Sequence, residues 1–154
     1  MTCALGTEKI MNVRIASAAP AVSTSADTIL RGLGAVLLLG VAQIHFLDVF
    51  DKFEENVAQG WMFAALIAGC LVATLALVHK SSLLVWTLAA LCGLAPLAGY
   101  IISRRIGLAG ATDDIGNWTE PLGLASISTE VSLVLISAYA LLYRRQSSEA
   151  AKQS

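Results

Sequence analysis

Four long runs of apolar residues, separated by three short polar stretches, dominate the pattern of this chain. Each run is about 20 residues long, which is enough for a helix rising about 1.5 Å per residue to cross the roughly 30 Å hydrocarbon core of a bilayer. A helix also satisfies its own backbone hydrogen bonds where water is absent. The runs are Ile29–Leu47, Gly60–Val78, Ser82–Ile102 and Leu122–Tyr143. The pattern therefore predicts an all-α fold of four transmembrane helices.

The lengths of the polar stretches predict the order of these helices. Short connections favour antiparallel neighbours, so we expect an up-down-up-down bundle over residues 29–143. Residues 1–28 are expected to form a flexible cytoplasmic segment, and residues 144–154 a cytoplasmic tail. The acidic segment Asp48–Gln59 has an amphipathic pattern and is expected to extend the first helix or to lie on the membrane surface. Small residues four apart in the second and third runs predict that these two helices form the tightest pair.

The basic residues predict the orientation, because Lys and Arg near helix ends favour the cytoplasmic side. Placing both termini and the turn near Lys80 on one side puts seven of the ten basic residues there. These are Lys9, Arg14, Arg31, Lys80, Arg144, Arg145 and Lys152. The chain is therefore expected to have both termini inside the cell, with most of its acidic residues outside.

Composition supports membrane insertion and excludes one class of partner. Hydrophobic residues make up 56% of the 154 residues and charged residues 14%, whereas soluble domains have about 25% charged residues. A net charge of −1 provides no electrostatic basis for binding nucleic acid. The expected partners are the lipid bilayer and either another protein or further copies of this chain.

Glu130 is the first candidate functional residue, because it lies near the middle of the fourth run. A charged group at that depth costs roughly 2.5–3.5 kcal/mol on insertion scales, so we expect Glu130 to face the bundle and to be largely protonated. Ser126 shares its helix face one turn away, and Gln43 and Tyr100 are expected to reach it from other helices. These residues could relay a proton or cation or anchor a polar ligand; alternatively, Glu130 only supports helix packing.

The polar residues at the outer ends of the helices are the second candidate. His45 and Asp48 lie three residues apart on one helix face, and the last loop supplies Asp113, Asp114 and Glu120. Imidazole with carboxylates suits a divalent metal ion. The alternatives are a solvated acidic face with a His–Asp hydrogen bond and a surface that docks another protein. A metal ion is the one cofactor that this pattern suggests.

The three cysteines do not form a disulfide framework. Cys70 and Cys92 are expected at similar depth in the second and third helices. They are either small buried apolar residues or a two-thiolate site for a soft metal.

The apolar helices, the His45-containing end of the first one and the loop Gly107–Pro121, with the sequence Asp113-Asp114-Ile115-Gly116-Asn117-Trp118-Thr119-Glu120-Pro121, resemble small four-helix integral membrane proteins of unassigned function from high-GC Gram-positive bacteria. The resemblance implies a multi-pass protein of the bacterial inner membrane and no particular activity.

Three functions remain open from the sequence, which carries no catalytic motif. The first is a non-enzymatic accessory or assembly subunit that engages a partner or ion through its outer acidic face. The second is a proton or cation relay or transporter that uses Glu130. The third is a metal- or cofactor-binding redox protein that uses His45. A cavity connecting Glu130 with solvent would favour the second.

Overall fold

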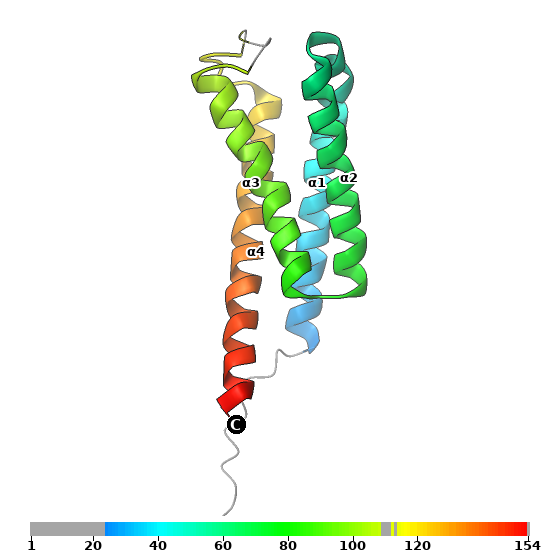
Figure 1. The fold of residues 1–154 in the computed structure, drawn as a ribbon, viewed down its shortest axis with the longest axis vertical. Helices are drawn as coiled ribbons and strands as arrows, with labels where there is room; N and C mark the ends of the chain where they lie inside the picture. The colour runs from blue at the N-terminus through cyan, green and yellow to red at the C-terminus, as the bar shows by residue number, and fades with distance from the viewer. Residues whose placement is uncertain (1–23, 109–111, 113, 154) are drawn as a thin grey trace, which may run out of the picture.

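The computed structural model describes residues 24–108, 112 and 114–153, and the described chain is all-helical. Four helices are long and apolar enough to cross a membrane, which confirms the prediction of four candidate spans. The helices are α1 Thr24–Glu55, α2 Val57–His79, α3 Leu83–Arg105 and α4 Pro121–Gln153 (Figure 1).

Two helices, α1 and α4, extend far beyond the apolar runs that predict them. α1 begins at Thr24, inside the segment expected to be flexible, and continues to Glu55 through the acidic segment. α4 continues to Gln153 through the segment expected to be a tail. Polar residues continue the helix at these ends. Hydropathy therefore locates the membrane spans but does not locate the helix termini.

The junction between α1 and α2 is a single residue, Asn56. Its extended backbone ends α1, and its side-chain oxygen accepts hydrogen bonds from the amides of Ala58 and Gln59, which caps α2. Gly60 makes this tight reversal feasible, because a Cβ atom there would lie 2.3 Å from the ring of Phe53. That ring packs edge-to-face against Trp61.

The helices associate as two hairpins. α1 packs most extensively on α2, and α3 packs most extensively on α4. The expectation that α2 and α3 form the tightest pair is therefore wrong. A Cβ atom at Gly69 would touch only the Cys92 sulfur at 3.8 Å, so the small residues of α2 do not bring its backbone unusually close to α3.

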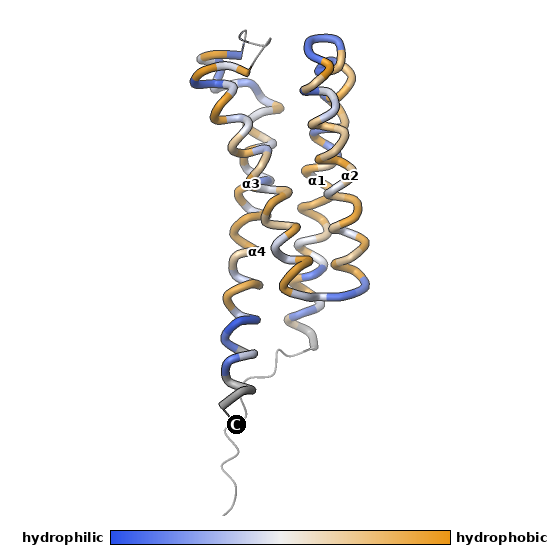
Figure 2. The backbone as a smooth tube through the Cα atoms, viewed as in Figure 1, coloured by the Kyte–Doolittle hydropathy of each residue, from blue (hydrophilic) through white to orange (hydrophobic). Residues whose placement is uncertain are grey.

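A compact apolar core joins the two hairpins between Glu130 and the α2–α3 turn. Leu38, Leu77, Trp86 and Leu133 are completely buried there. Most of the remaining large apolar side chains point outward, and Figure 2 shows apolar residues along the middle of every helix and polar residues toward the ends. This distribution is typical of a bundle surrounded by lipid.

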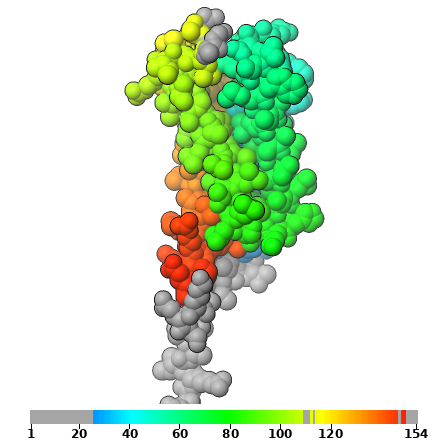
Figure 3. All heavy atoms as spheres, viewed as in Figure 1, coloured from blue at the N-terminus to red at the C-terminus, as the bar shows by residue number. Residues whose placement is uncertain are grey.

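The two ends of the bundle differ. We call the end with the α1–α2 junction and the α3–α4 connection the loop end, and the end with the α2–α3 turn the turn end (upper and lower in Figure 1). The ribbons of α1 and α2 separate from those of α3 and α4 toward the loop end. Nearer the turn end, the side chains of α2 and α3 meet on the face shown in Figure 3.

A cavity from the loop end to Glu130

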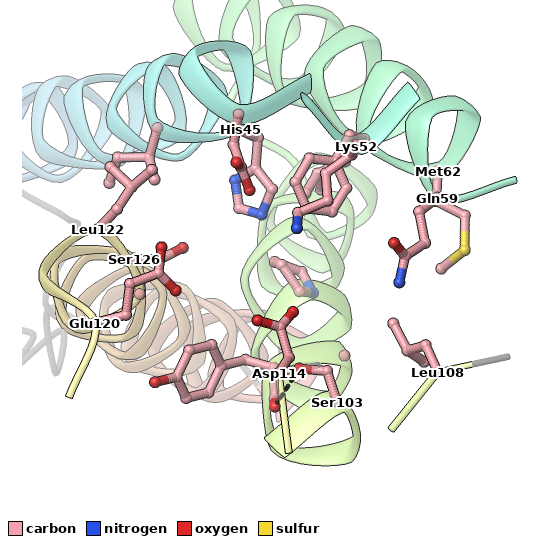
Figure 4. Close-up of a pocket in the computed structure, with 18 of the residues that line it drawn as sticks. His45, Lys52, Gln59, Met62, Ser103, Leu108, Asp114, Glu120, Leu122 and Ser126 are labelled. Carbon is pink, nitrogen blue, oxygen red and sulfur yellow. Dashed lines mark hydrogen bonds between the residues drawn. The ribbon is translucent and has the colours of Figure 1, made fainter. Parts of the chain in front are cut away.

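A cavity of about 430 Å³ lies between the two hairpins at the loop end. All four helices line it, and its wall extends from the acidic residues near the α1–α2 junction to Glu130 in the first third of α4. Figure 4 shows side chains from each element pointing into this space, among them His45 and Lys52 of α1, Gln59 of α2 and Ser126 of α4. Glu130 and the acidic residues of the loop end thus line the same cavity.

Glu130 lies at the deep end of this cavity and is 1% exposed. One carboxyl oxygen, Oε1, accepts a hydrogen bond from the hydroxyl of Ser126, one helical turn earlier. The other, Oε2, has no hydrogen-bond partner within the described part of the chain. A buried carboxyl oxygen without a partner is costly, so a hydrogen-bond donor that reached this atom would stabilise the site.

His45 faces Glu130 from α1. Its Nδ1 lies 2.9 Å from the carbonyl oxygen of Val41, four residues earlier. Because a carbonyl oxygen can only accept, Nδ1 carries the proton, and Nε2 of the neutral ring is an acceptor. Nε2 lies 3.8 Å from Oε1 of Glu130, which is longer than a direct hydrogen bond. When the carboxyl group is ionised, two acceptors therefore face one another across a small gap.

Aromatic and apolar side chains complete the deep part of the cavity. The ring of Phe63 packs edge-to-face against His45, with the ring centroids 4.9 Å apart. Leu66 and Pro96 line the same space from α2 and α3. This packing holds the imidazole in one orientation and gives the cavity an apolar wall beside its polar end.

Arg104 organises the mouth of the cavity, although it is only 5% exposed. Its guanidinium lies 2.7 Å from Asp114, forms an ion pair with Glu120 and stacks over the ring of Tyr100. The two ion pairs join the end of α3 to both ends of the described segment 114–120 in the α3–α4 connection. Gly116 also donates a backbone hydrogen bond to the Arg104 carbonyl at 3.0 Å.

The cavity wall carries an excess of acidic groups. Its described lining contains six carboxyl side chains and two basic ones. The carboxyl groups belong to Asp48, Asp51, Glu55, Asp114, Glu120 and Glu130. Lys52 pairs with Glu55 at 2.6 Å, and Arg104 pairs with the two loop acids, so both bases already have acidic partners. A buried oxygen of Gln59, also in the wall, has no partner among the described residues.

Of the three residues predicted around Glu130, the structure brings one to its carboxyl group. The structure brings Ser126 to the carboxyl group, whereas Gln43 is exposed on the outer surface of α1. Tyr100 lines the cavity, but its hydroxyl donates to the backbone oxygen of Trp118 at 3.3 Å. Gln43 and His45 lie about 200° apart around a helix of 3.6 residues per turn, so only one of them can face Glu130.

The four described residues among those predicted to hold a metal ion do not gather into one site. His45 faces Glu130, while Asp114 and Glu120 are held by Arg104. Asp48 lies in the cavity wall, and Asp113 lies outside the described residues. The described residues include no group of three His, Cys, Asp or Glu side chains that could hold a metal ion. The predicted His45–Asp48 hydrogen bond is replaced by the bond from His45 to Val41.

Sequence reasoning missed Arg104, Gln59 and Phe63. Arg104 adjoins Arg105 at a helix end, where basic residues commonly reach the membrane surface, and only the folded loop places two acids beside it. Gln59 and Phe63 lie one turn apart on α2 and show no distinctive spacing. Their role follows from the single-residue junction at Asn56, which orients that face of α2 toward α1 and the cavity.

Cys70 and Cys92 lie at the same depth, as expected. Both are buried free thiols, and their side chains lie near one another between α2 and α3. They belong to the apolar core cluster.

Comparisons with known proteins give no family for this chain: no family model, no curated protein and no solved structure matches it.

Proposed function

We propose that this protein binds an organic cation in the cavity at its loop end, with Glu130 as the anionic group that receives it. The observation that carries this proposal is the unpartnered Oε2 of Glu130, buried at the deep end of a cavity that extends to the loop end. Such a cavity is the feature expected of the cation-relay or transport alternative. The accessory-subunit role remains a prediction from the small size of the chain.

The distribution of donors and acceptors favours a cation over an anion. Nε2 of His45, Oε2 of Glu130 and the side-chain oxygen of Gln59 all accept hydrogen bonds, and carboxyl groups outnumber bases around them. A cationic group with several N–H donors can bridge the gap between His45 and Glu130. An anion would meet these acceptors at the deep end. Nε of Arg104 has no hydrogen-bond partner among the described residues, but its guanidinium lies at the mouth and is already paired with Asp114 and Glu120, and Lys52 is paired with Glu55.

The size and walls of the cavity favour an organic ligand. Sites for small molecules commonly occupy about 300–1,000 Å³ and combine apolar walls with a few polar groups. Phe63, Leu66 and Pro96 supply such a wall next to Glu130. A small ion would instead need a compact set of ligands, and no such set is found among the described residues.

Binding at Glu130 is proposed to exchange one proton for one cation. A lone carboxylate in apolar surroundings is costly, so without ligand the carboxyl group keeps its proton. A cation that hydrogen-bonds to it offsets the cost of ionisation, and the proton leaves. The net charge of the site is then the same before and after binding.

Calorimetric titration of the detergent-solubilised protein with benzylguanidinium tests the proposal. This probe carries a permanent charge, a planar fork of N–H donors and an apolar ring. Benzylurea is the matched neutral control with nearly the same shape. We expect benzylguanidinium to bind and benzylurea to bind at least about tenfold more weakly, since hydrogen bonds to charged groups are worth about 1.5–3 kcal/mol.

The variant Glu130→Gln provides the matched protein control, because it removes the charge and keeps the shape. It should weaken benzylguanidinium binding at least about tenfold and leave any benzylurea binding unchanged. Equal affinity of the two probes, or full benzylguanidinium affinity in Glu130→Gln, would contradict the proposal.

We further propose that the helices alternate in direction across a bacterial inner membrane, with both termini inside and the loop end outside. The support is the distribution of basic residues, since Arg31, Lys80, Arg144 and Arg145 all belong to the turn end. In this orientation the cavity takes its ligand from outside the cell. Substituted cysteines at positions 55 and 148 would test this: only the first should react with an impermeant reagent on intact cells.

A further inference from the structure

The turn end of the bundle is closed by a network of side chains centred on Arg144 of α4. Its guanidinium forms an ion pair with Asp27 of α1 and donates to the hydroxyl of Ser81 in the α2–α3 turn. A further hydrogen bond, 2.7 Å long, runs from Nη1 of Arg144 to the backbone oxygen of Ser81. One side chain thus ties the two hairpins together. We call Arg144, Asp27 and Ser81 the turn-end clamp.

Arg31 strengthens the clamp from within the first hairpin. Its Nε donates to the carbonyl oxygen of Leu77 at 2.8 Å, and its guanidinium also donates to that of Val78. These carbonyls lie in the last turn of α2, where helix carbonyls lack intrahelical partners. Arg31 also approaches Asp27 at 3.8 Å, so the acid that receives Arg144 is held by a second base.

Three polar residues of α4 are aligned along one side of the helix from the cavity to this clamp. Glu130, Ser137 and Arg144 are spaced seven residues apart and so lie on one side of the helix. Ser137 is completely buried, and its hydroxyl has no partner within the described chain. By contrast, the hydroxyls of Thr129 and Ser132 on the same helix donate to backbone carbonyls one turn earlier.

An apolar barrier separates Glu130 from the clamp. Leu133 of α4 and Leu38 of α1 are completely buried between them, as are Leu77 and Trp86 nearer the turn end. A cavity therefore lies on the loop-end side of Glu130, and packed apolar side chains close the bundle on its turn-end side. The unpartnered hydroxyl of Ser137 lies on the closed side of Glu130, where a bound ligand or water would satisfy it only if the turn end opened.

We propose that the protein transports the cation across the membrane, and that the turn-end clamp is the gate on the side opposite the cavity mouth. The proposal rests on the proposed function, because it requires Glu130 to bind the cation first. When Arg144 releases Asp27 and Ser81, the two hairpins separate at the turn end and expose Ser137 and Glu130 there. The cation leaves, and Glu130 takes up one proton in exchange.

Proteoliposomes test transport without any substitution. A gradient of benzylguanidinium should drive protons in the opposite direction, one for each cation, as reported by a pH indicator inside the vesicles. Since the exchange moves no net charge, clamping the membrane potential should leave its rate unchanged. Benzylurea should drive no proton movement. If benzylguanidinium binds in detergent but drives no proton movement, the transport proposal is wrong and the binding proposal stands. If benzylguanidinium does not bind, both proposals are wrong.

Labelling of position 137 tests the gate. In a chain whose native cysteines are replaced by alanine, a thiol introduced by Ser137→Cys should react slowly with a charged reagent applied at the turn end. Adding Asp27→Asn, which preserves shape but removes the ion pair, should speed this reaction roughly two- to fivefold, as loss of one partly exposed ion pair permits.

Glu149→Gln is the matched control, because Glu149 is an exposed acid of α4 near the same end and takes no part in the clamp. It should leave the labelling rate unchanged. Equal rates with and without Asp27→Asn, in protein that remains folded, would show that the clamp is not the gate. If Asp27→Asn fails to fold, Ser81→Ala removes the other side-chain contact of Arg144 and should speed labelling in the same direction.

Discussion

Glu130 shows how far a single residue can be interpreted from sequence. Its depth in the fourth apolar run and the position of Ser126 one turn away predict a buried carboxyl group with a serine neighbour, and both features are present. The approach of His45 could not be predicted in the same way. It depends on how α1 rotates against α4, and spacing within α1 alone is equally compatible with Gln43 facing inward.

Substitutions at Glu130 should separate its structural role from its role in binding. Glu130→Gln keeps an oxygen that can accept from Ser126, so the free energy of unfolding should change little. Glu130→Ala leaves Ser126 without its acceptor and should cost about 1 kcal/mol more. Chemical unfolding in detergent measures both. A loss as large in Glu130→Gln as in Glu130→Ala would mean that the carboxylate itself stabilises the fold.

At the scale of the helices, hydropathy predicts the spans, and local polar contacts decide where helices begin and end. The acidic segment after Leu47 remains helical to Glu55, and Asn56 alone reverses the chain. The pairing of helices follows from this reversal, because a one-residue junction holds α1 against α2 more firmly than small residues hold α2 against α3. The spacing of small residues could not reveal that the α1–α2 junction would decide which helices pair.

The α1–α2 junction should be sensitive to a single methyl group at position 60. Gly60→Ala places a Cβ atom against the Phe53 ring, which Trp61 also contacts, and should destabilise the protein by about 1–3 kcal/mol through overpacking. Thermal or chemical unfolding in detergent would measure the change.

Gly32→Ala is the matched control, since nothing lies within 4 Å of a Cβ atom there. Within a helix this change should be neutral or stabilising by about 0.4–1 kcal/mol. Equal effects of Gly60→Ala and Gly32→Ala would show that the junction is not tightly packed.

At the scale of the whole molecule, two hairpins meet around an apolar core, with a polar cavity at one end and an ionic clamp at the other. The sequence predicts four spans and an acidic loop end. It does not predict that the cavity lies at one end and the ionic clamp at the other. Arg104 lies in the last turn of α3 and Arg144 directly after the fourth apolar run, at positions where other basic residues also occur. Only their folded partners, Asp114 and Glu120 for Arg104 and Asp27 for Arg144, distinguish them.

Arg104 should control the mouth of the cavity rather than its deep end. Arg104→Gln removes the partner of Asp114 and Glu120, and these partly exposed acids then regain water. We expect a cysteine introduced at position 117, in the same loop, to react faster with a soluble thiol reagent. Benzylguanidinium affinity should change less than in Glu130→Gln. Unchanged labelling at position 117 would show that Arg104 does not hold the loop.

Infrared difference spectroscopy of the Glu130 carboxyl group measures whether Glu130 exchanges its proton for a bound cation. We expect a protonated carboxyl band that benzylguanidinium removes, that benzylurea leaves in place and that is absent from Glu130→Gln. Bound benzylguanidinium that leaves this band unchanged would contradict the account, because the cation would then occupy a site other than Glu130.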